Sequence, residues 1–312
     1  LCFCKNREEM SCSINKFFTA IGSSRQVFHV KLNRFMQRED EMGQLVLIVD
    51  QVREDHPGMA LRDLYHVIQP STIGRDRFEH YFKHMGYGVG IKRSFRRTTD
   101  SNGVIRFPNL IKDKELTGVN QLWVSDFTYY RIKESFYYLT FIMDLYSRKI
   151  IGHSCSQTLL TAHTTTVALR KALKNRKVNE LPGLIIHSDG GGQYYSDEFR
   201  KLTKQAKMVN SMGKTAYENP HAERVNGIIK NNYIRHYGPK TFLELIKMSN
   251  KAVDKYNTEK PHRALNKLSP TQFENTISEK LNNSKDTDGI KNKRITFTYN
   301  RLINTSKVVS TI

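Results

Sequence analysis

The sequence predicts an α/β layered domain that follows a smaller, all-helical region. Two observations carry this prediction. Up to about residue 86, apolar residues recur at three- and four-residue intervals, which is the period of amphipathic helices. From residue 121 onward, short runs rich in β-branched and aromatic residues are followed by helical patterns, as expected for a sheet covered by helices. A chain of 312 residues is long enough for two such units.

Residues 1–40 are expected to form a helix–turn–helix. Phe18 lies on the apolar face of a first short helix, and Gly22 permits a tight turn. A second helix is expected from Arg25 to about Phe35. Exposed basic side chains on that helix, Arg25 among them, would suit a DNA major groove. An ordinary helical hairpin would give the same pattern.

Residues 41–90 are predicted to form a compact helical domain. Apolar residues recur at helical spacing from Leu45 to Val52, and the chain is broken at 56–58 by His-Pro-Gly. Two more helical patterns follow before residue 86. The pattern fits a DNA-binding fold or a plain three-helix bundle.

Residues 91–118 lack periodicity and are expected to be a basic linker. Four of its cations are candidate phosphate contacts: Lys92, Arg93, Arg96 and Arg97. A solvated hinge would have the same composition.

Residues 119–278 carry the α/β pattern, and residues 279–312 form a basic C-terminal tail. Strands are expected at 122–132, 137–145, 149–156 and 184–187. Helices are expected at 160–174 and near 196–206, 220–236 and 240–257.

The charge balance points to a polyanionic partner. Fifty Lys and Arg stand against thirty Asp and Glu, a formal net charge of +20. Nucleic acid is the commonest partner of such a chain, although a merely basic protein would share the composition. No apolar run is long enough to span a bilayer and no signal peptide is visible, so we expect a cytoplasmic protein without a membrane partner. The first residue is Leu1, so we expect a fragment or the downstream part of a longer product.

The four cysteines do not predict a zinc site. Cys2, Cys4 and Cys12 cluster near the start, but no second Cys/His pair completes a zinc-binding spacing. We expect reduced thiols that bind no metal, with Cys155 in the core.

Three carboxylates stand where they are unhelpful for packing. Asp126 lies inside a strand-forming run, and Asp189 ends a strand just before three glycines that permit a sharp turn. Glu223 lies near the start of a helix that follows Pro220. If they meet at one edge of the domain, their oxygens are ligands of the kind that Mg²⁺ prefers.

A basic residue and an amide accompany Glu223. Lys230 follows it by seven residues, nearly two helical turns, and so shares its face, as does Asn226. A cation there would hold the DNA backbone. For Asp144 we favour a structural role. His187, Gln193 and His221 are expected to contact DNA or to support the acidic residues.

Five motifs in order resemble the integrase-core transposases of bacterial insertion sequences. They are Trp-Val-Ser-Asp-Phe-Thr-Tyr at 123–129, Asp-Leu-Tyr-Ser-Arg-Lys-Ile-Ile-Gly at 144–152, His-Ser-Asp-Gly-Gly-Gly-Gln-Tyr at 187–194, Asn-Pro-His-Ala-Glu-Arg-Val-Asn-Gly at 219–227, and Tyr-Asn at 256–257 with Lys-Pro-His-Arg-Ala-Leu at 260–265. The likeness is closest to the second open reading frame product of insertion sequence family three, and it covers about residues 14–275.

The resemblance implies an RNase H-like integrase core, a mixed five-stranded sheet flanked by helices. It implies that Asp126, Asp189 and Glu223 are catalytic and bind two Mg²⁺ or Mn²⁺ ions. The implied reaction is strand cleavage and strand transfer at the ends of an insertion sequence. Lys230 matches the family's basic residue two turns after its Glu. The interval from Asp189 to Glu223 is slightly shorter than the family's usual one, as a small deletion in the loop around residues 214–218 would explain.

The resemblance also implies partners. Double-stranded DNA, as element end and as target, would be bound near the site by Lys230, Arg224 and Asn226. Self-association on DNA is expected, together with a helix–turn–helix and coiled coil supplied by an upstream reading frame or a fusion. The alternatives are a catalytically inactive, domesticated DNA-binding protein and an RNase H-like nuclease without strand transfer.

Overall fold

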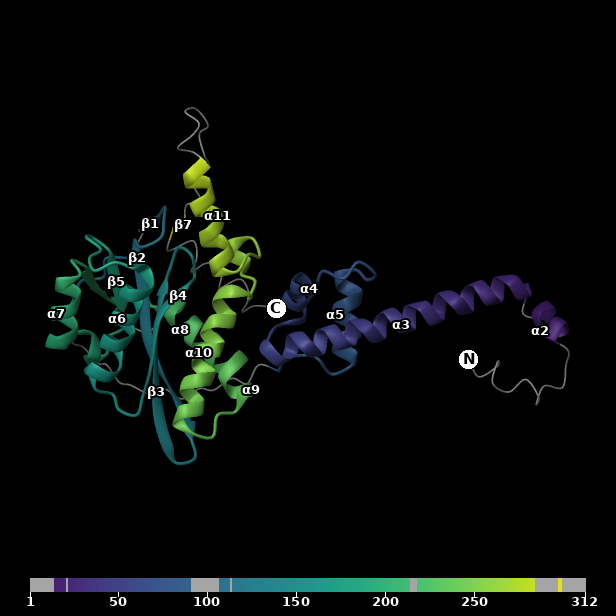
Figure 1. Ribbon diagram of the computed structural model, residues 1–312, viewed down its shortest axis with the longest axis horizontal. Helices are drawn as coiled ribbons and strands as arrows, with labels where there is room; N and C mark the ends of the chain where they lie inside the picture. Colours follow the sequence, from purple (N-terminus) through teal and green to yellow (C-terminus); the bar gives the residue numbers. More distant parts are fainter. Residues whose placement is uncertain are drawn as a thin grey trace.

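A layered α/β domain follows a helical region in this protein (Figure 1). The computed structural model describes residues 14–20, 22–90, 107–112, 114–213, 218–283 and 297–298. The predicted linker cations Lys92, Arg93, Arg96 and Arg97 lie outside the described residues, as do Cys2, Cys4 and Cys12.

Five strands form one mixed sheet at the centre of the α/β domain. They are β2 (Leu122–Ile132), β3 (Ser135–Asp144), β4 (Ile150–Ser156), β5 (Ile185–Ser188) and β6 (Val209–Met212), in the spatial order β4-β3-β2-β5-β6. The first three pair antiparallel, and β5 and β6 continue the sheet in parallel with β2. This arrangement confirms the mixed five-stranded, RNase H-like sheet. The strand β6 is the one that sequence patterning did not locate.

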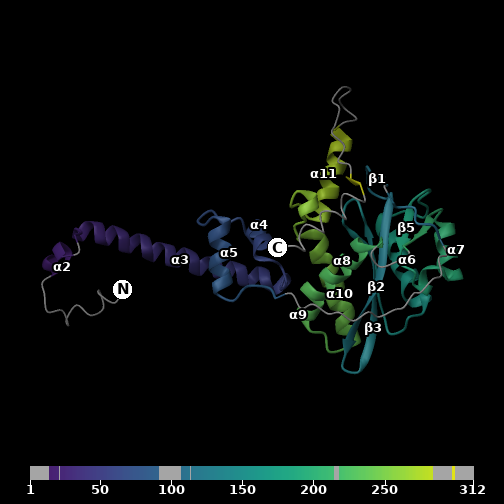
Figure 2. The ribbon, with the colours of Figure 1, turned by 180° about the vertical axis from the view of Figure 1, so that it is seen from behind.

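Helices cover both faces of the sheet (Figures 1 and 2). Trp123 on one face packs in a cluster with α6 (Thr165–Arg176) and α7 (Asp197–Gln205). Its neighbour Val124 points to the other face, as alternation along a strand requires. There it joins the cluster of α8 (Pro220–Ile228), α10 (Phe242–Thr258) and α11 (Pro270–Asn283). Because both faces are covered, consecutive residues of β2 are buried.

The helix that carries Glu223 continues well beyond α8. A π-helical segment, η5 (Ile229–Ile234), follows without a break and leads into α9 (Arg235–Tyr237). Together they form the helix expected near 220–236. Single π-turns inside α-helices are rare and occur frequently at functional sites.

Shorter elements complete the domain. They are the 3₁₀ turns η2 (Thr161–His163), η3 (Gly192–Tyr194) and η6 (Arg263–Leu265), and the antiparallel pair β1 (Glu115–Leu116) with β7 (Phe297–Thr298). Within the described part of the chain, no helix combines the length and the apolarity needed to cross a membrane.

The helical region contains α2 (Ile14–Ala20), α3 (Arg25–Asp55), α4 (Leu61–Ile68) and α5 (Arg75–His84). The break after residue 55 and the two helices beyond it are as predicted, and they bury one apolar cluster. The expected end of a helix near Phe35 is wrong, because α3 runs unbroken to Asp55. The predicted boundary at residue 40 therefore falls inside α3, which projects away from the sheet (Figures 1 and 2).

The polar middle of α3 is helical because its side chains bond along the helix. The Gln37 amide donates to Glu41 Oε1 at 3.0 Å, and the Gln44 amide donates to Asp40 Oδ2 at 3.2 Å. Such i,i+4 pairs stabilise a helix. Gly43 is the one glycine between Arg25 and Asp55, and an isolated glycine does not end a helix.

The segment after α3 docks the helical region onto η5. The Gly58 amide donates to the Asn232 carbonyl at 2.9 Å, and the backbones approach so closely that a Cβ on Gly58 would lie 2.4 Å from Asn232 Cα. The buried His56 contacts the Tyr233 hydroxyl through Nδ1 at 3.0 Å and Glu259 Oε2 through Nε2 at 2.8 Å. This contact ties the helical region to the helix that carries Glu223.

Candidate active site

Strand pairing brings Asp126 and Asp189 side by side. β2 and β5 are parallel neighbours, with Val124 opposite His187. Continued by two residues, to just beyond the end of β5, the same register would place Asp126 beside Asp189, and the charge of Asp189 does act on Asp126. Neighbouring strands lie about 4.8 Å apart, and residues two apart share a face. The two carboxyl groups therefore project to the same side of the sheet at the end of β5.

The α8–η5 helix lays a polar stripe over Asp126. The buried Asn226 donates through Nδ2 to Asp126 Oδ2 at 2.9 Å. Lys230 donates through Nζ to Thr128 Oγ1 at 2.9 Å and lies 5.2 Å from the centroid of the Tyr129 ring. Glu223 precedes Asn226 by three residues and so lies on the same helix face. Its side chain is exposed. The predicted sharing of one face is confirmed for Asn226 and Lys230, which both contact β2, and stays a prediction for Glu223.

The acidic groups interact electrostatically. Burial raises the pKa of Asp126 well above its usual value, and the charges of Asp189 and then Glu223 raise it further. Hydrogen bonds from the Phe127 amide and from Asn226 oppose this shift. Burial also raises the pKa of Asp189. Burial lowers the pKa of Lys230, and the charge of Asp126 partly restores it. The site therefore gathers negative charge that the chain itself compensates only in part.

The turn after β5 fixes the Asp189 carboxylate. The Gly191 amide donates to Asp189 Oδ1 at 3.1 Å. A Cβ on Gly191 would lie 2.9 Å from Phe127 Cε1 and 3.1 Å from Asp189 Oδ1. A larger residue at this position would have to displace one of these two side chains.

Buried polar groups beneath the site were not identified from the sequence. The Tyr194 and Ser125 hydroxyls are 2.9 Å apart, and Asn219 donates to the Ser125 carbonyl at 2.8 Å. Ser125 precedes Asp126, and Tyr194 follows the Asp189 turn, so these bonds link the two aspartate segments to the start of α8. The sequence signal that could have identified Ser125, Tyr194 and Asn219 is that each lies in a motif that also contains one of the acidic residues.

The donor set suits a hard divalent cation. Three carboxylates interact, and Asn226 Oδ1 is buried without a hydrogen-bond partner beside Asp126. As the side chains stand, no three Asp, Glu, His or Cys residues in the described ranges are gathered closely enough to hold one metal ion. Mg²⁺ usually takes one or two protein carboxylates and completes its shell with water and substrate phosphate. Asp126 on β2 and Asp189 just after β5, with the exposed Glu223 nearby, fit that pattern.

The remaining predicted DNA-binding residues are dispersed. Arg224 is exposed on α8, next to Glu223. Arg25 is exposed at the start of α3, and a helix of 31 residues places it about 45 Å from the docked end at Asp55. Arg25 therefore does not share a surface with the acidic site.

The histidines and Gln193 occupy supporting positions. His187 is fully buried and contacts Ser211 Oγ through Nδ1 at 2.9 Å and the Glu218 carbonyl through Nε2 at 3.2 Å. Gln193 donates to the Leu159 carbonyl at 3.2 Å. His221 accepts from Arg148 Nη1 at 3.2 Å.

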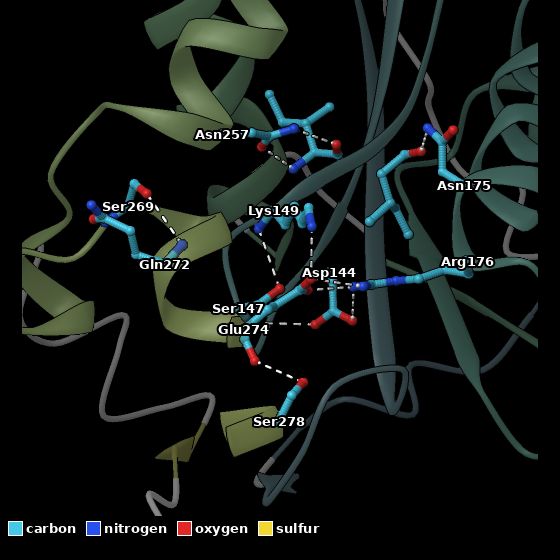
Figure 3. A network of polar contacts seen from close by, with 12 residues as sticks. Asp144, Ser147, Lys149, Asn175, Arg176, Asn257, Ser269, Gln272, Glu274 and Ser278 are labelled. Atoms are coloured by element: carbon cyan, nitrogen blue, oxygen red, sulfur yellow. Dashed lines mark hydrogen bonds and ion pairs between the residues drawn. The ribbon is translucent and has the colours of Figure 1, made fainter. Parts of the chain in front are cut away.

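Asp144 is held in a separate structural network (Figure 3). It is fully buried, accepts from the Asn120 amide at 2.7 Å, and pairs with Arg176 at 3.0 Å. Arg176 and Lys149 also pair with Glu274 of α11. These contacts join the β3–β4 turn to α6 and α11, in agreement with the favoured structural role.

Comparison with known proteins identifies the family. The family described as "Integrase core domain" matches residues 117–217, and a second family of the same description matches residues 204–270. A 31 kDa protein of insertion element IS600 from Shigella sonnei is 32% identical over 206 residues, which are 64% of this chain and 75% of that protein. The chain belongs to the IS3-family insertion-sequence transposases with an integrase core domain.

Two further similarities were found, one to a curated transposase and one to a solved structure. Transposase InsF for insertion sequence IS3A of Escherichia coli strain K12 is 34% identical over 170 residues, which are 53% of this chain and 58% of that protein. Among solved structures, the HTLV-2 integrase catalytic core domain in complex with magnesium aligns with a TM-score of 0.39 and 24% identity, over 53% of this chain and 98% of that one.

Proposed function

We propose that this transposase cuts and joins DNA strands by metal-dependent phosphoryl transfer at Asp126, Asp189 and Glu223. The observation that carries the proposal is the β2–β5 register, which sets two carboxylates side by side beneath the helix that bears the third. When bound there, two Mg²⁺ or Mn²⁺ ions would activate the attacking oxygen and stabilise the leaving oxygen. DNA is the proposed substrate, both as element end and as target.

The chain's own residues have distinct tasks in this proposal. Asp126 accepts a hydrogen bond from Asn226 and Asp189 accepts one from the Gly191 amide, and these bonds would orient the two carboxylates for metal binding. Lys230 is fixed over Tyr129 and beside Thr128, where its ammonium can hold a backbone phosphate. Rigid placement of this kind lowers the barrier because the reacting groups are already oriented.

The reaction is proposed as two displacements at phosphorus. In the first, a water oxygen bonds to phosphorus at the element end and the element's 3′ oxygen leaves as a hydroxyl. In the second, that 3′ oxygen bonds to a target phosphorus, and the target's own 3′ oxygen leaves. The second step joins the strands directly without a covalent intermediate on the protein.

Cellular placement and assembly follow from the substrate as further proposals. A chromosomal target would place the protein at the nucleoid, in the cytoplasm. Self-association on DNA and a segment supplied by an upstream reading frame are expected, because two element ends must be brought together.

An Asp189→Asn variant tests the proposal. Asparagine keeps the shape of the side chain and removes the charge. With a plasmid that carries the element's ends, Mg²⁺- or Mn²⁺-dependent joined products should fall by more than about 10²-fold, as expected when an electrostatic stabiliser is lost. The matched control is Asp197→Asn, at an exposed carboxylate at the start of α7.

Each outcome distinguishes the proposal from its alternatives. Joining that is unchanged in Asp189→Asn rules out the acidic site. Nicked DNA without joined products from the unmodified chain indicates a nuclease. Salt-sensitive DNA binding with neither product indicates an inactive binding protein.

A further inference from the structure

A second, basic cluster lies beside α8 and contains a buried arginine. Arg148 occupies the turn between β3 and β4 with φ +62° and is 7% exposed. Its Nη1 donates to His221 Nδ1 at 3.2 Å, and its Nε has no hydrogen-bond partner. Among the described residues, no carboxylate forms an ion pair with Arg148. The nearby Asp144 is already paired with Arg176 at 3.0 Å.

The groups around Arg148 are mainly cations, histidines and Tyr256. Arg224, Lys260 and His262 all lie within electrostatic range of one another or of Arg148. The His262 ring packs edge-on against Tyr256, with centroids 4.8 Å apart, and its Nε2 is buried without a hydrogen-bond partner.

The cluster has little negative charge of its own. Asp63 approaches Lys260 at 3.6 Å and Lys267 at 3.0 Å, so one carboxylate is shared between two lysines. Nothing in the described chain neutralises Arg148 and Arg224 in the same way. Burial lowers the pKa of Arg148 to about 10, which leaves it protonated at neutral pH.

A buried cation without a counter-ion is costly to a fold. Desolvation is offset only when the charge is paired and its donors are used. Arg148 and His262 each keep an unused buried nitrogen, and the exposed Arg224 places the edge of the cluster at the surface. These features indicate an anion supplied from outside the chain.

We propose that Arg148, Arg224, Lys260 and His262 form a binding site for one backbone phosphate of DNA. Arginine suits this ligand because its planar fork of donors matches phosphate oxygens. His262 donates in the tautomer that carries its proton on Nε2. The proposed function enters only in naming DNA as the source of the phosphate.

The position of this phosphate site is defined by α8. Glu223 and Arg224 are consecutive residues, so the acidic site and the phosphate site lie on adjoining faces of one helix. The stripe of Asn226 and Lys230 faces β2 and is separate from it. A strand held at both places would cross α8, which would fix the strand's direction as it enters the acidic site.

DNA binding by the full chain in EDTA tests the phosphate site without catalysis. Fluorescence anisotropy with a labelled duplex would be measured across salt concentrations. An Arg148→Met variant removes the charge and keeps much of the volume. It should make the negative slope of log K against log salt less steep by about 0.9. At 0.1 M salt that corresponds to binding about 8-fold weaker. The control Arg170→Met, at an exposed cation of α6 on the opposite face of the sheet, should leave the slope unchanged.

Thermal unfolding without DNA provides a second readout. If Arg148 awaits an external anion, Arg148→Met should raise the Tm, because an uncompensated buried charge is removed. Inorganic phosphate should stabilise the unmodified chain more than the variant. A lower Tm with an unchanged salt slope would show that Arg148 only supports His221, and it would overturn the proposal.

Two further comparisons keep the test decisive. If Arg148→Met does not fold, Arg224→Met at the exposed edge must make the salt slope less steep by the same amount. An unchanged slope for Arg224→Met would overturn the proposed phosphate site. The joining assay separates the two proposals, because Asp189→Asn tests the acidic site and leaves the phosphate site intact. A normal slope for Arg148→Met together with inactive Asp189→Asn would sink this inference alone.

Discussion

Gly191→Ala should impair the acidic site while leaving the fold largely intact. Gly191 has φ −62° and ψ 135°, which alanine adopts without strain. The added Cβ, however, would lie 2.9 Å from Phe127 Cε1 and 3.1 Å from Asp189 Oδ1. Carbon atoms pack at about 3.5–4.0 Å, so the ring or the loop must move by about 0.6–1 Å. The Asp189 carboxylate lies in the path of that movement.

The expected consequences can be sized separately for stability and for joining. Overpacking lowers the free energy of unfolding by about 1–3 kcal/mol. Alanine makes the unfolded chain less flexible than glycine does, which raises the free energy of unfolding by about 0.4–1 kcal/mol. A net loss of about 1 kcal/mol would lower the Tm by about 2–4 °C. A displacement of about 1 Å in a positioned group costs about 10²-fold in rate. Joined products should therefore fall far more than the stability does.

The neighbouring glycine provides the control. A Cβ on Gly192 would lie 3.5 Å from the Tyr195 hydroxyl oxygen, an ordinary contact. Gly192→Ala should thus keep both the Tm and the joining activity, measured by calorimetry and by gel analysis of plasmid products. Equal joining by Gly191→Ala and Gly192→Ala would refute the reasoning.

Three further perturbations follow from the structure. Asp126→Asn removes a buried carboxyl group whose ionisation is opposed by burial and by the charge of Asp189. The variant should therefore raise the Tm of the metal-free protein at neutral pH and abolish any stabilisation by Mg²⁺, and a lower Tm would count against crowded carboxylates. Gly58→Ala places a Cβ 2.4 Å from Asn232 Cα and should lower the free energy of unfolding by about 1–3 kcal/mol. Amide hydrogen exchange at the end of α3 should become faster. Unchanged exchange would mean that this contact does not hold the helical region in place. Burial lowers the pKa of His153 from 6.5 to about 4, so between these pH values the unfolded chain binds a proton that the folded chain does not. The free energy of unfolding should therefore fall as the pH drops from about 6.5 towards 4. In denaturant titrations His153→Gln should flatten this pH dependence, and an unaltered dependence would assign the loss to other groups.

The core could be predicted from the sequence where burial imposes a clear period. The long strands β2, β3 and β4 are rich in β-branched and aromatic residues, and α6 and α10 have apolar stripes. The strand β6 escaped because it is only four residues long and includes Asn210 and Ser211. Its strand character comes from pairing with β5, which is a tertiary contact that no local pattern records.

The candidate site could be predicted from the sequence only in part. Asp126 and Asp189 are conspicuous because a carboxylate in a buried strand segment opposes packing. Their neighbourhood depends on β2 and β5 pairing in parallel, and the sequence alone does not specify that register. The proposed role of Arg148 could not be predicted from the sequence, because an arginine in a turn is usually exposed and its burial becomes evident only in the folded structure.

The helix from Pro220 to Tyr237 shows why separate motifs need a common element. Its first turns carry Glu223 and Arg224, while Asn232 and Tyr233 of η5 receive the helical region through Gly58 and His56. A regular α-helix closes its ladder every four residues, and a π-segment inserts one extra residue into a turn. Everything after the insertion is rotated relative to the stripe that faces β2. One helix can therefore turn Asn226 and Lys230 towards β2 and still present the Asn232 backbone to Gly58. Docking of the helical region and the proposed phosphoryl-transfer geometry thus depend on the same helix.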